Sequence, residues 1–439
     1  MANIFFAMYP EFGHLYTSFG LAQKLLASNH DISYLGIPDS EEIVRSKGFE
    51  FKSIFEDIFP AGSTYYRIPN QGTSRLWEQI NAFKYQKTRN KKFFDFLFTE
   101  DIDQLLLDIS PDLFIVDSSL PFLALCAYRN GISTLMLSVT LQERSKYLPP
   151  LTSSIIPSPN WYNRLMIRLS WENVFIRKSL LGILRLLFGI DLDFPKLLQE
   201  LAESADYQID KINTITTLMP GINMLELIMC PEVFDFTRKK PDYMRYIGLS
   251  LPAEENADQF PWERLDQDIP LIFCTLGSSI SVYSNHRNFI QTLIDSIGNR
   301  SNWQLVVGVG TEININNFNN PHSNVILVNW APYESILKRS SIMINHGGLG
   351  SVKQCIYYGV PMIIFPLGRD QPGNAARIKY HGLGLVGDPR RITDKYFNDL
   401  IDTIQSDDTY KQRTEEMGVM FREIEIADDG VKFINELLS

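Results

Sequence analysis

A glycine-rich stretch in the C-terminal third of the chain has the composition of a phosphate-binding turn. Residues 342–344 are apolar and predict a short buried strand, and residues 346–351, His-Gly-Gly-Leu-Gly-Ser, predict a turn that opens onto a helix. Glycines let backbone N–H groups approach a ligand closely, and the N-terminus of a helix attracts anions. We therefore expect a phosphate group to bind at this turn.

A polar pair follows the next strand of the chain. Residues 361–366 predict that strand, which ends shortly before Asp370 and Gln371. The glycine-rich turn and the polar pair then fall at the carboxyl ends of neighbouring strands, where open α/β sheets bind ligands.

A second group of reactive side chains lies in the N-terminal half. His14 follows an apolar strand at residues 4–8, and Asp117 ends another strand at residues 113–117. Strand-end residues of neighbouring strands can meet at the rim of a sheet. Because imidazole titrates near neutral pH, His14 is a candidate general base, and Asp117 would fix its tautomer. The alternative is that His14 is structural and that Asp117 caps a helix.

The elements that must position these residues form two series. A length of 439 residues predicts two domains, and residues 251–258, which are acidic, are a candidate linker. Alternating apolar strands and amphipathic helices on both sides of this linker predict two units with parallel sheets. The first turn carries only one glycine and lacks the G-x-G-x-x-G pattern, which argues against a dinucleotide site there.

Composition narrows the class of protein further. The formal net charge of −10 argues against general binding to nucleic acid, which requires a basic surface. The four cysteines lie far apart in apolar runs without metal-binding spacing, so we expect buried thiols. The first residues lead directly into a strand and do not have the pattern of a signal peptide, which predicts a cytoplasmic protein.

The spacing of residues 330–374 resembles the nucleotide-sugar signature of UGT-like, inverting GT-B glycosyltransferases. Its elements are Trp-Ala-Pro, the His-x-Gly-x-x-Ser turn, Gly-Val-Pro and Asp-Gln-x-x-Asn. The chain is most similar in appearance to the bacterial zeaxanthin and macrolide glycosyltransferases. The resemblance implies an α/β GT-B fold, in which two Rossmann-like domains with parallel sheets face each other across an interdomain cleft. The implied domains are 1–245 for the acceptor and 246–417 for the nucleotide-sugar, and a C-terminal helix at about 418–439 packs back onto the first domain.

The same resemblance assigns His14 and Asp117 to catalysis. The donor-binding residues implied by the motif and its turns are Ser278, Trp330, Ala331, His346, Gly348, Leu349, Gly350, Ser351, Gln354, Asp370 and Gln371. The flat face of Trp330 suits a stacked pyrimidine. Related enzymes usually carry glutamate where this chain has Gln354, so the choice between UDP and dTDP stays open. Helix dipoles and amides would stabilise the leaving diphosphate, so we predict no cofactor and no metal requirement.

Residues 139–189 interrupt the regular alternation of strands and helices. Residues 161–187 are rich in aromatic, aliphatic and basic side chains, which predicts either helices that line an apolar acceptor pocket or a basic amphipathic helix on a membrane surface. The acceptor-binding candidates are Phe12, Trp161 and Trp171. Arg185 interrupts the longest apolar run, so we expect no membrane span.

The sequence therefore predicts a glycosyltransferase that moves a hexose from a UDP- or dTDP-sugar to a hydroxyl group of a hydrophobic or aromatic small molecule, giving a β-glycoside. One alternative is a catalytically silent, nucleotide-binding auxiliary subunit. Another is a glycolipid glycosyltransferase at the membrane periphery, and an epimerase or phosphorylase of the same fold is disfavoured by the His-Asp pair. We expect a monomer or weak dimer.

Overall fold

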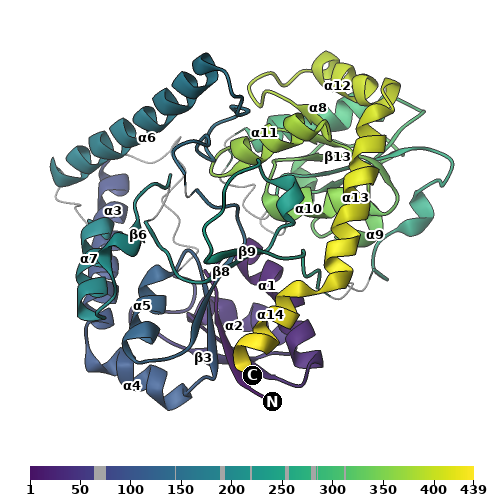
Figure 1. The fold of residues 1–439 in the computed structure, drawn as a ribbon. Helices are drawn as coiled ribbons and strands as arrows, with labels where there is room; N and C mark the ends of the chain where they lie inside the picture. Colours follow the sequence, from purple (N-terminus) through teal and green to yellow (C-terminus); the bar gives the residue numbers. More distant parts are fainter. Residues whose placement is uncertain are drawn as a thin grey trace.

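The protein contains two parallel β-sheets, each flanked by helices, in a computed structural model that describes residues 1–63, 76–143, 145–187, 193–217, 220–252, 257–277, 283, 285–310 and 313–439. Figure 1 shows the two sheets in separate halves of the molecule, with the N- and C-termini close together on the first half. This arrangement confirms the predicted α/β class with two parallel sheets.

The first sheet has seven strands, and every pairing in it is parallel. In spatial order they are β3 (Glu50–Ser53), β2 (Asp31–Gly36), β1 (Asn3–Ala7), β4 (Leu113–Asp117), β5 (Thr134–Ser138), β8 (Glu226–Ile228) and β9 (Met244–Tyr246). The helices of this half are α1 (Phe12–Ala27), α2 (Glu41–Ser46), α3 (Leu76–Leu97), α4 (Glu100–Ile109), α5 (Pro121–Arg129), α6 (Trp161–Leu187) and α7 (Phe194–Ser204). A short antiparallel ribbon joins β6 (Ile212–Asn213) to β7 (Gly221–Ile222).

The second sheet has six strands and is also parallel. Its order is β12 (Val325–Val328), β11 (Gln304–Gly308), β10 (Leu271–Thr275), β13 (Ser340–Asn345), β14 (Met362–Ile364) and β15 (Gly384–Val386). The accompanying helices are α8 (His286–Gly298), α9 (Tyr333–Leu337), α10 (Leu349–Tyr357), α11 (Gln371–His381) and α12 (Asp394–Ser406). In both sheets the first strand of the series, β1 or β10, lies in the interior, and the later strands are added first on one side of it and then on the other. This is the doubly wound topology, which binds ligands where the strand order switches sides.

Strand register decides which strand ends are neighbours. In the first sheet Ala7 pairs with Val116, so the turn after β1 begins beside Asp117. In the second sheet Asn345 pairs with both Thr275 and Ile364, so the turns after β10, β13 and β14 leave the sheet at one level. The predicted acid–base pair and the predicted phosphate-binding turn therefore each lie at the carboxyl edge of a sheet.

The C-terminal segment forms two helices where a single helix was expected. These are α13 (Thr409–Ala427) and α14 (Asp429–Leu438), and between them Asp428 has a left-handed backbone with φ of 52°. Figure 1 shows both helices in yellow, running from the second half to the first. Packing explains the break, because α13 packs on α10 whereas α14 packs on α1.

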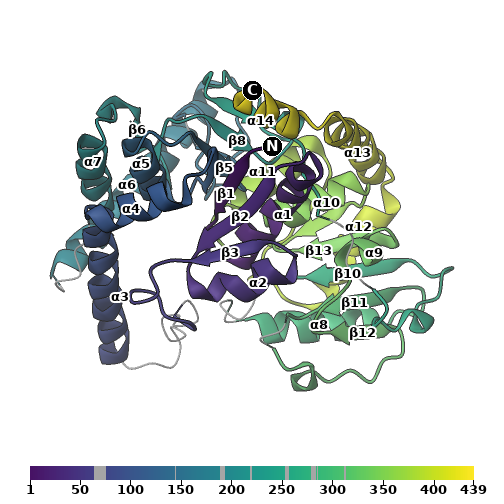
Figure 2. The ribbon, with the colours of Figure 1, turned by 90° about the horizontal axis from the view of Figure 1, so that it is seen from below.

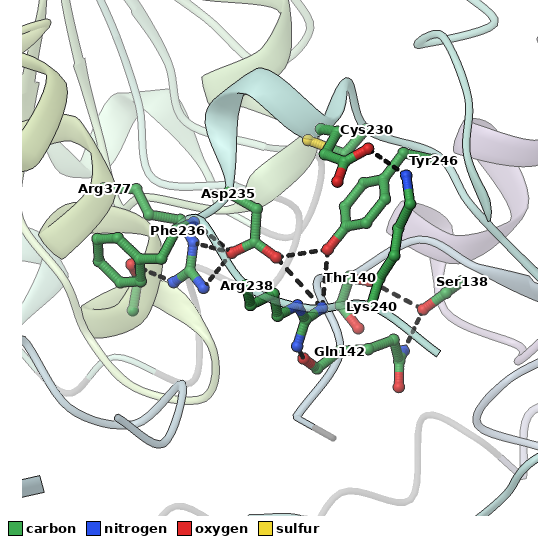
Figure 3. A network of polar contacts seen from close by, with 12 residues as sticks. Ser138, Thr140, Gln142, Cys230, Asp235, Phe236, Arg238, Lys240, Tyr246 and Arg377 are labelled. Atoms are coloured by element: carbon green, nitrogen blue, oxygen red, sulfur yellow. Dashed lines mark hydrogen bonds and ion pairs between the residues drawn. The ribbon is translucent and has the colours of Figure 1, made fainter. Parts of the chain in front are cut away.

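A buried ionic network joins the segment before β9 to α11 (Figure 3). Asp235 Oδ1 accepts hydrogen bonds from Arg377 Nε at 2.8 Å and Arg377 Nη2 at 2.5 Å. The other oxygen of Asp235 accepts a hydrogen bond from the Tyr246 hydroxyl and lies 3.2 Å from Arg238 Nη2. Burial opposes ionisation of Asp235, but the two arginines lower its pKa below the ordinary value, so the network is charged. Loss of one partner would leave an uncompensated buried charge.

Two further expectations concern the linker and membrane crossing. Helix α7 ends at Ser204, and the chain then leads into the β6–β7 ribbon. Residues 253–256 of the expected linker lie outside the described residues. Among the described helices, none combines the length and hydropathy needed to cross a bilayer.

Candidate functional site

His14 and Asp117 meet at the carboxyl edge of the first sheet. His14 Nδ1 lies 2.7 Å from Asp117 Oδ2, and the backbone N–H of Ser119 donates to Asp117 Oδ1 at 2.8 Å. Asp117 is fully buried, whereas the His14 side chain keeps 18% of its surface exposed. A buried carboxylate held by backbone donors fixes the imidazole so that Nδ1 faces Asp117 and Nε2 remains to accept a proton.

The electrostatics of this pair favour a charged imidazolium beside a charged carboxylate. Burial works against protonation of His14, but the Asp117 carboxylate outweighs it and raises the pKa of His14 above its ordinary value. Burial would likewise raise the pKa of Asp117, but His14 and the backbone N–H groups of Ser119 and Tyr9 lower it. Asp117 therefore stays ionised and strengthens His14 as a base.

The first turn of α10 contains the residues that were predicted to bind phosphate at the edge of the second sheet. Gly348 is the N-cap residue, and Gly348 through Ser351 present the backbone N–H groups that have no partner within the helix. Leu349 is 4% exposed and packs in the core, so only its backbone faces a ligand. Ser351 and Gln354 are half-buried and lie one helical turn apart, which puts both polar groups on one face of α10.

Two glycines hold the His346 ring between them. A Cβ atom on Gly277 would lie 2.6 Å from His346 Cε1, and one on Gly348 would lie 2.6 Å from His346 Nε2. Gly277 also has φ of 84°, which favours glycine. Burial lowers the pKa of His346 to about 4, so the ring is neutral at physiological pH. Its Nδ1 is buried without a hydrogen-bond partner among the described residues, and a phosphate oxygen could provide one.

Asp370 and Gln371 start α11 and hold the preceding turn. Asp370 Oδ2 accepts a hydrogen bond from Asn374 Nδ2 at 2.9 Å, and the same amide donates to the carbonyl of Gly347 at 2.9 Å. Gln371 Oε1 accepts hydrogen bonds from the backbone of Leu367 at 2.7 Å and of Gly368 at 3.0 Å. Burial raises the pKa of Asp370 above the ordinary value. Asn374 therefore ties Asp370 to the glycine-rich turn, and Gln371 is bonded to the turn before α11.

The two sheet edges approach each other through the first turn of α1. A Cβ atom on Gly350 would lie 4.0 Å from Thr17 Oγ1, and Thr17 follows His14 by one helical turn. Both ribbon views show α1 beside α10 (Figures 1 and 2). The helix that carries His14 therefore lies beside the helix whose N-terminus was predicted to bind phosphate.

Aromatic and ionic contacts reinforce this approach. The Phe12 and Trp330 rings meet edge to face, with centroids 5.7 Å apart. Arg369 forms a bidentate ion pair with Glu11, at 2.7 Å and 3.1 Å. Sequence reasoning missed Glu11 and Arg369 because ion pairing between residues 358 positions apart depends on how the two halves dock. Asn374 was visible as the last residue of the motif but was not assigned a role.

The remaining donor candidates have distinct environments. Trp330 is 52% exposed and Ala331 is 8% exposed, so an indole face is accessible at the end of β12. Ser278 lies outside the described residues, but the preceding Gly277 contacts His346. The contacts of Trp330 and Ala331 with a nucleotide base, and that of Ser278 with the donor, therefore remain predictions.

The three acceptor candidates do not share one environment. Phe12 stacks on Tyr16, with ring centroids 5.2 Å apart, in the first turn of α1. Trp171 is 2% exposed and donates from Nε1 to the carbonyl of Leu148 at 2.8 Å, so it anchors the segment before α6. Trp161 is 76% exposed at the start of α6. Trp171 is buried and Trp161 is exposed because of how α6 packs on distant parts of the chain, and helical spacing alone did not predict this difference.

The described residues contain no cluster of three or more His, Cys, Asp or Glu side chains arranged to hold a metal ion. The four cysteines are buried and free, as their apolar surroundings predicted. Metal independence stays a prediction.

Comparison with known sequences identifies a family. The sequence profile of the family described as UDP-glucoronosyl and UDP-glucosyl transferase matches residues 63–426. An uncharacterized UDP-glucosyltransferase of Bacillus subtilis (strain 168), YdhE, is 25% identical over 197 residues, which cover 45% of this chain and 49% of the relative. The chain spans about half the length of the curated relatives it matches.

Solved structures with the same fold cover the whole chain. The spinosyn forosaminyltransferase SpnP superposes with a TM-score of 0.67 at 15% identity, covering 100% of this chain and 99% of that one. The glycosyltransferase VinC, solved in complex with DTDP, has a TM-score of 0.63 at 16% identity and 99% coverage of both chains. At these identities the structural likeness establishes the fold, and it confirms the expected GT-B architecture.

Proposed function

Because the chain belongs to the UDP-glucoronosyl and UDP-glucosyl transferase family, we propose that it transfers a hexose from a nucleotide-sugar to a hydroxyl group of a hydrophobic or aromatic small molecule, with inversion at the anomeric carbon. The observation that carries the proposal is the 2.7 Å contact between His14 and Asp117 on the first sheet, with α1 lying beside the first turn of α10 on the second. In the proposed mechanism, the base and the leaving-group site come from different sheets.

The reaction follows from the roles of these groups. His14 Nε2 takes the proton of the acceptor hydroxyl as the acceptor oxygen forms a bond to the anomeric carbon. The bond from that carbon to the diphosphate oxygen breaks, and the nucleotide diphosphate leaves with the electron pair. Attack from the face opposite the departing group inverts the anomeric centre, so an α-linked donor gives a β-glycoside. Asp117 stabilises the imidazolium that forms.

Neutral groups would hold the leaving diphosphate. The backbone N–H groups of Gly348 to Ser351, the dipole of α10 and His346 Nδ1–H would donate to its oxygens. Because these donors are fixed before the substrate arrives, they stabilise developing negative charge without reorganising. Asp370 and Gln371 would bind the sugar hydroxyls, and Trp330 would stack on the base.

The donor nucleotide should be tested as both UDP and dTDP. VinC was solved with DTDP, and the Bacillus subtilis relative is named as a UDP-glucosyltransferase, so the relatives support both choices. Ribose recognition would fall to Gln354, an amide that bonds hydroxyls less strongly than a carboxylate does.

A glycosyl-transfer assay tests the proposal. Purified protein is incubated with UDP-glucose or dTDP-glucose and a panel of hydrophobic alcohols and phenols, and products are identified by mass spectrometry and anomeric NMR coupling. A β-linked product that disappears in His14→Ala supports the proposal. Nucleotide binding without turnover over the whole panel would instead indicate a silent auxiliary subunit, and an α-linked product would contradict inversion.

A further inference from the structure

Helix α6 exposes an apolar stripe that is interrupted midway, where Glu172 and Asn173 are exposed between Leu169 and Ile176. Six large side chains on one face are each between 42% and 58% exposed, namely Tyr162, Leu165, Leu169, Ile176, Leu180 and Ile183. Their spacings of 3, 4, 7, 4 and 3 residues repeat at close to two helical turns, so all six project from the same side of the helix. Exposed apolar patches of this extent mark an interaction site. Figure 1 shows α6 at the periphery of the molecule.

The opposite face of α6 is fixed to the protein. Ile167 is 3% exposed and Trp171 is 2% exposed, and Trp171 is hydrogen-bonded to Leu148. On the same side, Lys178 Nζ donates to the carbonyl of Thr216 at 2.6 Å. The buried side chains therefore orient the apolar stripe outward, and the stripe cannot turn inward without loss of these contacts.

Basic side chains border the stripe. The sequence of α6 contains five basic residues and one acidic residue, a net charge of +4 in a chain whose formal net charge is −10. Arg168 and Arg177 are exposed on opposite flanks of the stripe, whereas Arg164 is exposed on the side of the helix that carries Trp171, seven residues away. Trp161 and Tyr162 at the start of the helix are exposed amphipathic rings, which favour a membrane interface.

We propose that the outer face of α6 binds the surface of a bilayer that contains anionic phospholipids. The apolar stripe would enter the headgroup and acyl boundary while the flanking arginines bind lipid phosphates, as in interfacial amphipathic helices. A second copy of the chain fits this face less well, because pairing two α6 helices would bring basic flanks against basic flanks. The proposal is independent of sugar transfer, since its readout is binding to lipid.

Vesicle co-sedimentation of the purified full-length chain tests this inference. We expect the protein to pellet with phosphatidylcholine vesicles that contain phosphatidylserine, to pellet poorly with phosphatidylcholine alone, and to be released by added salt. Leu169→Glu with Ile176→Glu should abolish pelleting. Arg168→Glu with Arg177→Glu should weaken it by about 30-fold or more, because each basic residue near an anionic surface contributes about fivefold in affinity.

A matched control uses exposed apolar residues elsewhere. Val419→Glu with Met420→Glu changes two exposed side chains of α13 and should leave pelleting unchanged. Thermal unfolding followed by circular dichroism checks that every variant is folded. The inference is overturned if wild-type protein does not pellet with anionic vesicles, or if the α6 variants pellet as well as the control. It is also overturned if lipid-free sedimentation shows a dimer that Leu169→Glu with Ile176→Glu dissociates, because the stripe would then bind a second copy.

Discussion

The carboxyl edges of the two sheets carry different kinds of polar groups. At the edge of the first sheet, two titratable side chains lie 2.7 Å apart, and their pKa values shift so that both favour the charged form. At the edge of the second sheet, the groups are backbone amides, a helix N-terminus and a histidine whose pKa burial lowers to about 4. Under the proposed function, one half of the molecule would move a proton and the other would hold an anion without changing protonation.

This difference explains why a doubly wound sheet can serve both tasks. The carboxyl edge of each sheet offers turns and helix N-termini, and the residue types in those turns decide what the edge does. A histidine after β1 next to a buried aspartate gives an acid–base pair. Glycines after β10 and β13 give close backbone approach.

The largest expected effect comes from His14→Ala, which removes the proposed base at the edge of the first sheet. Removing the base should lower kcat by about 10³-fold, because general bases contribute about 10² to 10⁴, while the dissociation constant for UDP or dTDP stays the same. Steady-state kinetics and calorimetric nucleotide titration measure the two quantities. His286→Ala, an imidazole at the start of α8, is the control and should keep wild-type kcat. If His14→Ala weakened nucleotide binding as much as it lowered kcat, the two sheet edges would not be functionally separate.

Asp117→Asn should have the next largest effect, a fall in kcat of about 10²-fold, the lower end of what acid–base catalysis contributes. Because the Asp117 carboxylate is what raises the pKa of His14, wild-type activity should rise with pH through a midpoint above the ordinary histidine value of 6.5. Without the carboxylate, burial lowers that pKa, so the acid limb of the profile should move to lower pH. An unchanged midpoint in a kcat/KM profile would show that His14 is not the titrating group.

His346→Ala tests the other edge. We expect the KM for the nucleotide-sugar to rise by about tenfold, the equivalent of one buried hydrogen bond. The acid limb of the kcat/KM pH profile should stay where it is in the wild type. The limb should stay because His346 is neutral throughout the working range. A shifted limb would contradict the division between a titrating edge and a neutral one.

Glu11→Ala and Arg369→Ala should have small effects, about two- to fivefold in kcat/KM, because the ion pair that links the two edges is exposed. A double-mutant cycle should give a coupling energy of at most about 1 kcal/mol, decreasing with salt. Much larger coupling would indicate that this pair controls how the halves dock.

A chelator should have no effect. If amides and the α10 dipole suffice for the diphosphate, EDTA will leave the transfer rate unchanged, and added Mg²⁺ or Mn²⁺ will not increase it. A rate that falls with EDTA and returns with a divalent cation would show that the second edge needs a metal.

The sequence alone determined the local features of this protein. Strand and helix periodicity predicted two parallel sheets, and glycine chemistry identified the turn at residues 346–351. The pairing of His14 with Asp117 was also predictable, because the ends of neighbouring strands in a parallel sheet share one edge. These features depend on residues that are close in sequence or on a topology with few alternatives.

Only the tertiary structure decided the features that depend on docking and burial. Glu11 meets Arg369 across the two halves, Trp171 turns inward while Trp161 stays exposed, and the C-terminal segment breaks at Asp428 to pack on both halves. Apolar residues occur on both faces of α6, so the sequence pattern alone did not show which face would be buried. It therefore could not distinguish a pocket wall from an exposed stripe. Which side of a helix is buried is set by the surface it packs against, and that surface is assembled from distant parts of the chain.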